Sequence, residues 1–140
     1  MSRTVIVDTG PLVASLNERD QYHKWARKQS QNLPHPYITC EAVLSEAWFL
    51  LEKFPADQEK LLKLLENKHV QINFDLSAEV DVIVGLLRRY KNIPMSIADA
   101  CLVRMSELHT DCVIFSTDSD FQIYRRHSNQ IIPALLPPSA

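Results

Sequence analysis

Two acidic residues stand at or just beyond the ends of short apolar segments near opposite ends of the sequence. Asp8 follows Val5-Ile6-Val7 and leads into Gly10-Pro11, which is typical of a strand that ends on a carboxylate before a helix begins. Asp118 follows the apolar residues 113–115 in a similar way. Because ligands bind beyond the carboxyl ends of parallel strands, we expect both carboxylates to meet there. Such charges need a cation or a shared proton to offset their repulsion when they are partly buried.

Two further acids lie within helical patterns. Glu46 is the one charged residue in the almost entirely apolar stretch 42–50, and a charged Glu is rarely buried without a partner. It therefore marks a site, reaches water at the edge of the helix, or pairs with Lys53. Asp99 follows Ser96 at the S-x-x-D spacing of a capping box, which explains it without any function. A helix N-terminus also suits bound phosphate or metal, so the two roles are compatible.

Helix capping is the competing explanation for the remaining acids. Asp8 is well placed to cap the helix that follows it, although Thr9 could cap that helix equally well. Asp120 fits a second capping pattern that begins at Thr117, so a ligand role and a capping role are equally open for it. For Asp8 and Asp118, the position beyond a strand end favours a functional role over capping alone.

Acids on separate elements, without accompanying His or Cys ligands, suit a hard divalent cation. Mg²⁺ and Mn²⁺ prefer oxygen ligands and retain several waters. Such an ion polarises a phosphate, activates water and stabilises the leaving oxygen. The acids Asp8, Glu46, Asp99 and Asp118 therefore predict a metal site that carries out phosphoryl chemistry.

The composition argues against several other kinds of protein. Gly10 and Gly85 are the only glycines, so no Gly-rich phosphate-binding loop is present. Three cysteines in apolar surroundings predict reduced core thiols in a cytoplasmic protein, with no disulfide framework or zinc site. The five histidines are scattered at mostly polar positions, which favours surface roles. We expect no signal peptide before the first strand, and no apolar run approaches the ~18 residues of a membrane span.

Charge alone does not decide whether the chain binds nucleic acid. The formal net charge is −2, but it becomes +2 once the four candidate acids are set aside. Two basic runs, residues 88–91 and 125–127, fall at the ends of predicted helices. They either complement the helix dipole or contact substrate phosphates, and contacts of the second kind would make binding salt-dependent.

Helical and strand-like patterns alternate along the chain, which predicts βαβ units and a parallel sheet. The 140 residues suit a single domain, residues 1–140, with its own core. Strands are expected at 4–7, 37–39, 70–74 and 112–116, with a weak fifth strand at 130–132 and an irregular tail at 133–140. Helices are expected at 11–17, 20–31, 40–53, 56–67, 77–90, 96–108 and 118–124. The segment 40–53 is apolar nearly all round, so we expect it to be buried or part of an interface.

Four short motifs, in this order, resemble the PIN-domain ribonucleases, especially the VapC-type toxins of prokaryotic toxin–antitoxin pairs. The motifs are Val7-Asp8-Thr9, Val43-Leu44-Ser45-Glu46-Ala47, Ile97-Ala98-Asp99-Ala100 and Thr117-Asp118-x-Asp120-Phe121. Each motif is weak by itself, but four in order at the spacing of the family are fairly specific. The resemblance covers nearly the whole chain.

The resemblance implies a three-layer α/β/α sandwich with a parallel sheet of about five strands. It also implies Mg²⁺- or Mn²⁺-dependent hydrolysis of an RNA phosphodiester bond, a homodimer, and a cognate antitoxin that blocks the site. The implied catalytic acids are Asp8, Glu46, Asp99 and Asp118. The implied metal ligands are Asp8, Asp99, Asp118 and the more variable Asp120, and Thr9 and Thr117 would orient a water or a phosphate.

Other functions fit the residues less well. A signalling receiver domain needs paired acids after the first strand, where Asp8 stands alone, and a phosphatase with an Asp nucleophile needs an acid where Gly10 lies. The strongest alternative is a PIN-like fold that binds RNA or protein without catalysis. In that case, replacing Asp8 or Asp118 would leave the function intact.

Overall fold

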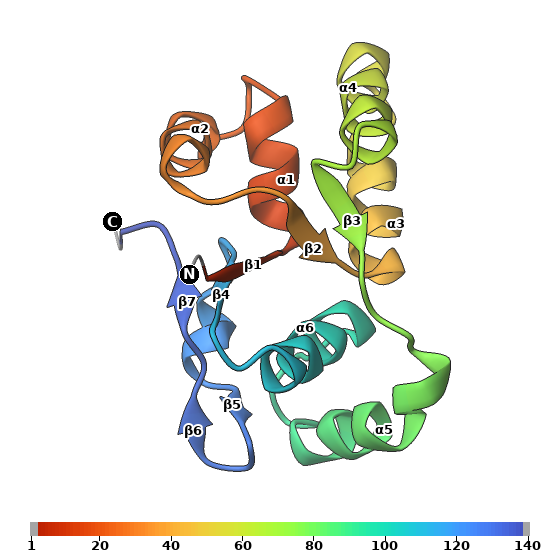
Figure 1. Cartoon of the computed structure of the whole chain (residues 1–140), viewed down its shortest axis with the longest axis vertical. Coiled ribbons are helices and arrows are strands. Elements are labelled where there is room, and N and C mark those ends of the chain that lie inside the picture. The colour runs from red at the N-terminus through yellow and green to blue at the C-terminus, as the bar shows by residue number, and fades with distance from the viewer. Residues whose placement is uncertain (1–2, 139–140) are drawn as a thin grey trace.

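A five-stranded parallel sheet forms the centre of the protein (Figure 1). The structure is a computed structural model that describes residues 3–138. The strands are β1 (Thr4–Val7), β2 (Tyr37–Thr39), β3 (Val70–Ile72), β4 (Cys112–Phe115) and β7 (Ala134–Leu135), in the order β3-β2-β1-β4-β7. The chain builds outward from β1 through β2 to β3, then returns to the other side of β1 as β4. The strand order therefore reverses between β1 and β4, which is the position where open α/β sheets bind ligands.

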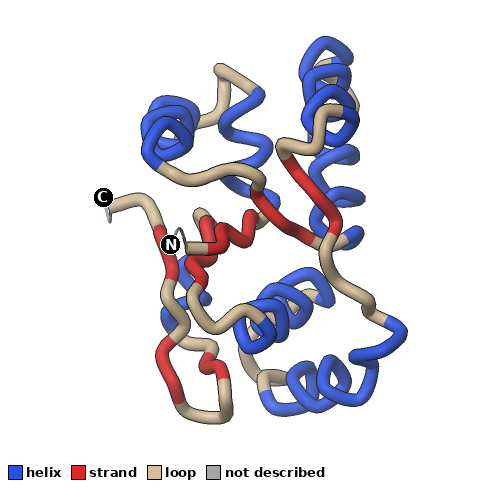
Figure 2. The backbone as a smooth tube through the Cα atoms, in the orientation of Figure 1, coloured by secondary structure: helices blue, strands red, loops and turns tan. Residues whose placement is uncertain are grey.

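Six α-helices surround this sheet and give the three-layer α/β/α sandwich that the resemblance implied (Figures 1 and 2). They are α1 (Thr9–Leu16), α2 (His23–Asn32), α3 (Glu41–Leu50), α4 (Pro55–Glu66), α5 (Val80–Arg89) and α6 (Ile97–Leu108). Helix α1 packs against α2, while α6 packs against β1, β4 and α5. Helix α3 contacts both α1 and α6, so it lies beside the strand ends where these two helices begin.

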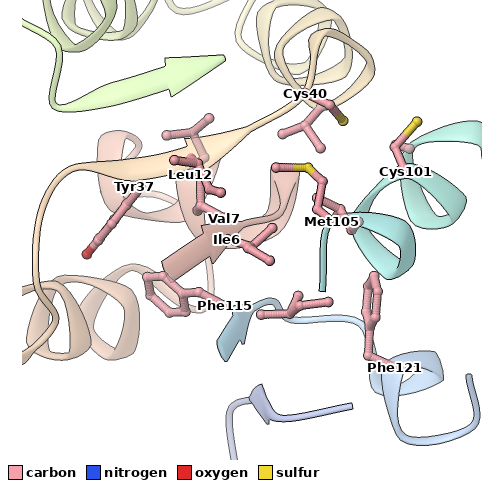
Figure 3. Packing of buried hydrophobic residues seen from close by; sticks show 14 of the residues in the cluster. Ile6, Val7, Leu12, Tyr37, Cys40, Cys101, Met105, Phe115 and Phe121 are labelled. Atoms are coloured by element: carbon pink, nitrogen blue, oxygen red, sulfur yellow. The ribbon is translucent and has the colours of Figure 1, made fainter. Parts of the chain in front are cut away.

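Buried side chains fill both faces of the sheet. Residues 5–7 of β1 and all four residues of β4 are buried, as expected for strands that are covered by helices on both sides. Figure 3 shows Ile6 directed toward Met105 of α6, whereas Val7 and Phe115 line a cavity beside α1. The cysteines are free and buried, as the sequence predicted. Within residues 3–138, no helix combines the length and the apolar character needed to cross a bilayer.

The fifth strand of the sheet does not lie where the sequence predicted it. Residues Gln130–Ile131 form β6, which pairs antiparallel with β5 (Arg125–Arg126) in a separate hairpin. The tail that was expected to be irregular contains β7, which pairs with β4 through Ile114 and Ala134. The carbonyl of Pro133 accepts a hydrogen bond from the Ile114 N–H at 2.9 Å. Pro133 can join this edge strand because the pairing uses its carbonyl and not the N–H that proline lacks.

Three predicted helices are shorter or more broken than expected. The segment after Asp118 makes only a 3₁₀ turn, Ser119–Gln122, and Ser77–Glu79 forms a separate 3₁₀ turn ahead of α5. Helix α3 ends at Leu50, and its last turn is not buried, since Phe49 is 64% exposed. The sequence predicted that this apolar helix is either buried or part of an interface. Its exposed last turn shows that burial is wrong, and the interface stays a prediction.

Candidate functional site

Asp8 lies at the end of β1 and caps the N-terminus of α1. Its Oδ1 accepts a 2.8 Å hydrogen bond from the Thr9 backbone N–H. Its Oδ2 accepts a 2.7 Å hydrogen bond from the Ser116 hydroxyl, which follows β4 directly. The residue is 7% exposed. Hydrogen bonds from Thr9 after β1 and from Ser116 after β4 therefore hold the carboxylate where the strand order reverses.

Asp99 lies in the first turn of α6 and forms the capping box that the sequence predicted. Its backbone N–H donates to Ser96 Oγ at 3.0 Å, and its Oδ2 accepts from the Ser96 N–H at 3.1 Å. The Tyr124 hydroxyl donates a further hydrogen bond to the same oxygen at 3.3 Å. Asp99 is buried and lines the same cleft as Asp8. It therefore serves both as a helix cap and as a residue of the cleft.

Asp118 follows β4 and caps the 3₁₀ turn behind it. Its Oδ1 accepts a 2.9 Å hydrogen bond from the Asp120 N–H. Its own N–H donates to Ser116 Oγ at 2.9 Å, so one serine hydroxyl contacts both Asp8 and the backbone of Asp118. This shared serine couples the end of β1 to the end of β4.

These acids line one cleft of about 330 Å³ at the carboxyl edge of the sheet. The residues that line it are Asp8, Thr9, Gly10, Glu46, Leu50, Ser96, Asp99, Thr117 and Asp118. All four predicted catalytic acids and both predicted orienting threonines are among them. Asp120 is absent from the lining, and its half-buried carboxylate lies one turn behind Asp118.

Glu46 reaches the cleft for a different reason from the one the sequence suggested. The sequence favoured a site because so apolar a helix has little exposed face, and it left open an edge position that reaches water or a pair with Lys53. In the structure Glu46 is exposed, and it lies one helical turn from Leu50 at the open side of the cleft. Among residues 3–138, no hydrogen bond or ion pair engages its carboxylate. Glu46 is therefore the cleft acid with the most freedom to meet a ligand.

Gly10 permits the Thr117 side chain to approach the start of α1 closely. A Cβ at Gly10 would lie 2.0 Å from Thr117 Oγ1, well inside van der Waals contact. Gly10 does not have a positive φ, so it is needed for lack of space and not for a special backbone conformation. Thr9 is buried, and its hydroxyl faces the Val43 carbonyl of α3 at 3.4 Å. Of the two threonines, only Thr117 therefore keeps a hydroxyl near the cleft that forms no hydrogen bond within residues 3–138.

Burial and mutual repulsion make the ionised acids costly. The pKa of Asp8 is raised from 3.8 to about 6, and burial is the largest cause. Hydrogen bonds from Ser116 and Thr9 oppose this rise, and the charges of Asp99 and Asp118 add to it. Burial also raises the pKa of Asp99, with an added contribution from Asp118. The cleft therefore favours a bound proton or a cation over three bare carboxylates.

The chemistry of the donors suits a hard divalent cation, although the side chains are not arranged around one. The cleft supplies carboxylate and hydroxyl oxygens, which Mg²⁺ and Mn²⁺ prefer. Within residues 3–138, no three His, Cys, Asp or Glu side chains lie close enough to hold a metal ion together. Asp8 and Asp99 direct oxygens to serines and to backbone N–H groups in this conformation. Binding an ion would therefore require rotation of these side chains.

Two residues of the site were not identified from the sequence. Ser116 is not among the predicted site residues, yet its fully buried hydroxyl orients Asp8. Tyr124 was counted within a short helix, yet its buried hydroxyl contacts Asp99 and the Pro94 carbonyl. Ser116 could have been found, because it occupies the same strand edge as Asp118. The position of Tyr124 depends on the loop before α6, which no local pattern encodes.

Comparison with known proteins agrees with this architecture. A family model for the PIN domain matches residues 5–126. The fold also matches the crystal structure of VapC20 from Mycobacterium tuberculosis, a toxin that cleaves the sarcin–ricin loop, with a TM-score of 0.76 and 20% sequence identity over 86% of this chain and 94% of that chain. No curated protein matches the sequence. The match of the family model across most of the chain, on a parallel sheet with an acidic cleft at its carboxyl edge, shows that this protein belongs to the PIN domain family.

Proposed function

We propose that this protein is a Mg²⁺- or Mn²⁺-dependent endoribonuclease, and that it acts as the toxin of a toxin–antitoxin pair. The observation that carries the proposal is the convergence of Asp8, Asp99 and Asp118 in one cleft, where burial and mutual charge raise the pKa of Asp8 to about 6. The PIN family and the fold likeness to a toxin that cleaves the sarcin–ricin loop support RNA as the substrate.

Each acid of the cleft receives a distinct role. Asp8, Asp99 and Asp118 would hold the cation, and Asp120 would join them if its half-buried side chain turned toward the cleft. The bound cation would neutralise these acids, polarise the scissile phosphate and activate the attacking water. Ser116 orients Asp8 through its 2.7 Å hydrogen bond to Oδ2, and rotation of the Asp8 side chain would present an oxygen to the ion.

The remaining polar groups handle the water and the phosphate. Glu46 is exposed at the open side of the cleft, where its carboxylate can accept a proton from the attacking water. The Thr117 hydroxyl lies beside Gly10 at the start of α1, close enough to orient that water or a phosphate oxygen. Thr9, whose hydroxyl faces α3, would act through its backbone N–H, which fixes Asp8.

The proposed partners are RNA, an antitoxin that blocks the cleft, and a second copy of the chain. Helix α3 supports the last of these, because Trp48, Phe49 and Leu50 expose apolar surface next to the cleft. Apolar surface gathered on one helical turn favours association over solvent contact. The proposed activity is therefore RNA cleavage in the cytoplasm, controlled by a protein inhibitor.

A PIN fold that binds RNA or protein without catalysis is the second candidate. One observation favours it: Asp8, Asp99 and Asp118 each serve as a helix or turn cap, which explains their presence without a metal. Capping alone does not explain the burial of Asp8 and Asp99, since exposed acids cap helices equally well. We therefore place catalysis first.

Thermal unfolding with added metal tests the cation site directly. We expect millimolar Mn²⁺ or Mg²⁺ to raise the melting temperature of the wild type, because a ligand that binds only the folded state stabilises it. The Asp118→Asn variant should lose most of this shift. Asp111→Asn is the matched control, since Asp111 is exposed at the other end of β4. An equal shift in all three proteins, or no shift in the wild type, would contradict the metal site.

A further inference from the structure

The two basic runs of the sequence come together on the surface as one patch. Tyr90 ends α5, and its hydroxyl accepts a 2.9 Å hydrogen bond from the Arg125 backbone N–H. The Arg89 guanidinium donates to the Ser128 carbonyl of the β5–β6 hairpin. Figure 1 shows the C-terminal end of α5 beside this hairpin, in agreement with both contacts. We call the group Arg88, Arg89, Lys91 and Arg125 the basic patch.

The helix dipole does not explain the whole basic patch. Arg88 and Arg89 occupy the last turn of α5, where cations complement the dipole, but Lys91 lies beyond the end of the helix. One guanidinium nitrogen of Arg125 donates to three carbonyls at the end of the 3₁₀ turn and just after it, including that of Gln122 at 2.7 Å. Arg88 and Lys91 are exposed, and no ion pair engages either of them within residues 3–138. Two cations of the patch are therefore available to a ligand.

Nearby acids do not neutralise the patch either. Glu107 is the carboxylate that reaches the hairpin, where it accepts a 2.7 Å hydrogen bond from the His127 N–H. Its other oxygen pairs with Arg104 at 3.1 Å, and Arg104 also pairs with Glu79 at 2.8 Å. Arg104 is thus shared by Glu79 and Glu107 on the α6 side of the hairpin, and neither carboxylate forms an ion pair with a cation of the patch within residues 3–138.

A short chain of contacts connects the patch to the acidic cleft. The rings of Tyr90 and Tyr124 meet edge to face, with centroids 5.1 Å apart. The Tyr124 hydroxyl contacts both the Pro94 carbonyl and Asp99 Oδ2. The loop that carries Lys91 also leads within a few residues to Ser96, which lines the cleft. Two packed tyrosines, Tyr90 and Tyr124, therefore connect the basic patch to Asp99 of the acidic cleft.

We infer that the basic patch binds backbone phosphates of single-stranded RNA beside the scissile bond, through Arg88 and Lys91 above all. An acidic cleft repels a polyanion, so a cationic surface next to it is needed to hold the strand in place. Exposed Arg and Lys side chains supply such contacts without base readout, and their contribution falls with salt because counterions are released on binding. This inference deepens the proposed nuclease function, and it concerns binding alone.

Fluorescence anisotropy with a labelled oligouridylate in EDTA tests the patch without cleavage. We expect Arg88→Gln/Lys91→Gln to raise Kd about 25-fold at 0.1 M salt, and to reduce the slope of log Kd against log salt by about 1.4, because each lost phosphate contact removes about 0.7 from that slope. The charge-preserving variant Arg88→Lys/Lys91→Arg should bind like the wild type. Lys24→Gln/Lys28→Gln on α2 is the control of equal charge, because both lysines are exposed on the opposite helical layer.

The outcomes separate the patch from the nuclease function. A wild type that binds RNA through Arg88 and Lys91 but cuts none would support the patch and overturn the nuclease proposal. A wild type that cuts RNA while Kd and salt slope stay unchanged in Arg88→Gln/Lys91→Gln would overturn the patch. Poly-glutamate is the competing ligand. If it binds as tightly as the oligouridylate and shows the same loss in the double variant, the patch recognises an acidic polypeptide and the RNA inference is wrong.

Discussion

The Ser116 hydroxyl donates a 2.7 Å hydrogen bond to Asp8 Oδ2 across 108 positions of the sequence. The same hydroxyl accepts the Asp118 N–H at 2.9 Å, so one buried serine connects the ends of the two strands that flank the site. This hydrogen bond lowers the pKa of Asp8, whereas burial raises it. Ser116 therefore sets both the position and the proton affinity of the central acid.

Replacing Ser116 with Ala should shift the pH dependence of activity. Without the donated hydrogen bond, the pKa of Asp8 should rise above its value of about 6, so the acidic limb of the pH–rate profile should move to higher pH. Ser119→Ala, one turn away and exposed, is the control. An unchanged acidic limb in a folded Ser116→Ala protein would mean that this hydrogen bond does not tune the acid.

Asp8→Asn should change how stability depends on pH. Asp8 holds its proton more tightly in the folded chain, where its pKa is about 6, than in the unfolded chain, where it is near 3.8. The folded wild type should therefore lose stability as pH rises from about 4 to about 6, by at most about 3 kcal/mol, and the variant should not show this loss.

Urea unfolding of both proteins at pH 4 and pH 7 measures this difference. The expected result is a variant that gains on the wild type between the two pH values, and is the more stable protein at pH 7. A difference in unfolding free energy that is the same at both pH values would show that Asp8 is not held in a costly ionised state.

Gly10→Ala should destabilise the protein and disturb Thr117. The added Cβ would meet Thr117 Oγ1 at 2.0 Å and Thr117 Cβ at 3.1 Å, so rotation of the threonine relieves only part of the clash. We expect a loss of about 1–3 kcal/mol, which Thr117→Ala in the same chain should partly restore.

Gly85→Ala is the matched control, because nothing lies within 4 Å of a Cβ there. In the middle of α5 it should stabilise the protein by up to about 1 kcal/mol, since alanine favours helix. Chemical denaturation measures all three variants. A Gly10→Ala protein as stable as Gly85→Ala would contradict the close approach between α1 and the residues after β4.

Phe49→Glu should weaken self-association if α3 forms the proposed homodimer. Phe49 is 64% exposed beside Trp48, so a charge there would disrupt an apolar interface without disturbing the core. Ile131→Glu on the hairpin, where the side chain is 72% exposed, controls for the added charge. Light scattering over a range of concentrations measures the mass, and a wild type that remains monomeric at high concentration would rule out the dimer.

The sequence predicted the elements that depend on local patterns. Strands β1, β2 and β4 lie where continuous apolar runs placed them, because burial on both faces leaves a strong signal. The capping box of Ser96 and Asp99 formed as its spacing required. The convergence of the four acids in one cleft was also predictable, because parallel strands and the helices that follow them share one edge of the sheet.

Features that depend on long-range contacts could not be predicted in this way. Strand β7 has only two residues and follows a proline, so its pairing with β4 is visible only when the sheet is assembled. The exposure of Glu46 depends on how α3 lies against α1 and α6, which the composition of the helix does not determine. The two basic runs are joined by hydrogen bonds between Tyr90 and Arg125 and between Arg89 and Ser128, which link residues more than 30 positions apart.

Cleavage of a labelled structured RNA is the most direct test of the proposed function. The wild type, Asp8→Asn and the exposed control Asp111→Asn would each be incubated with Mn²⁺, with Mg²⁺ or with EDTA. We predict cleavage by the wild type and by Asp111→Asn with either metal, and none in EDTA or with Asp8→Asn, because the cation and the central acid act together. Cleavage by a folded Asp8→Asn protein at the rate of the wild type would contradict the proposed chemistry.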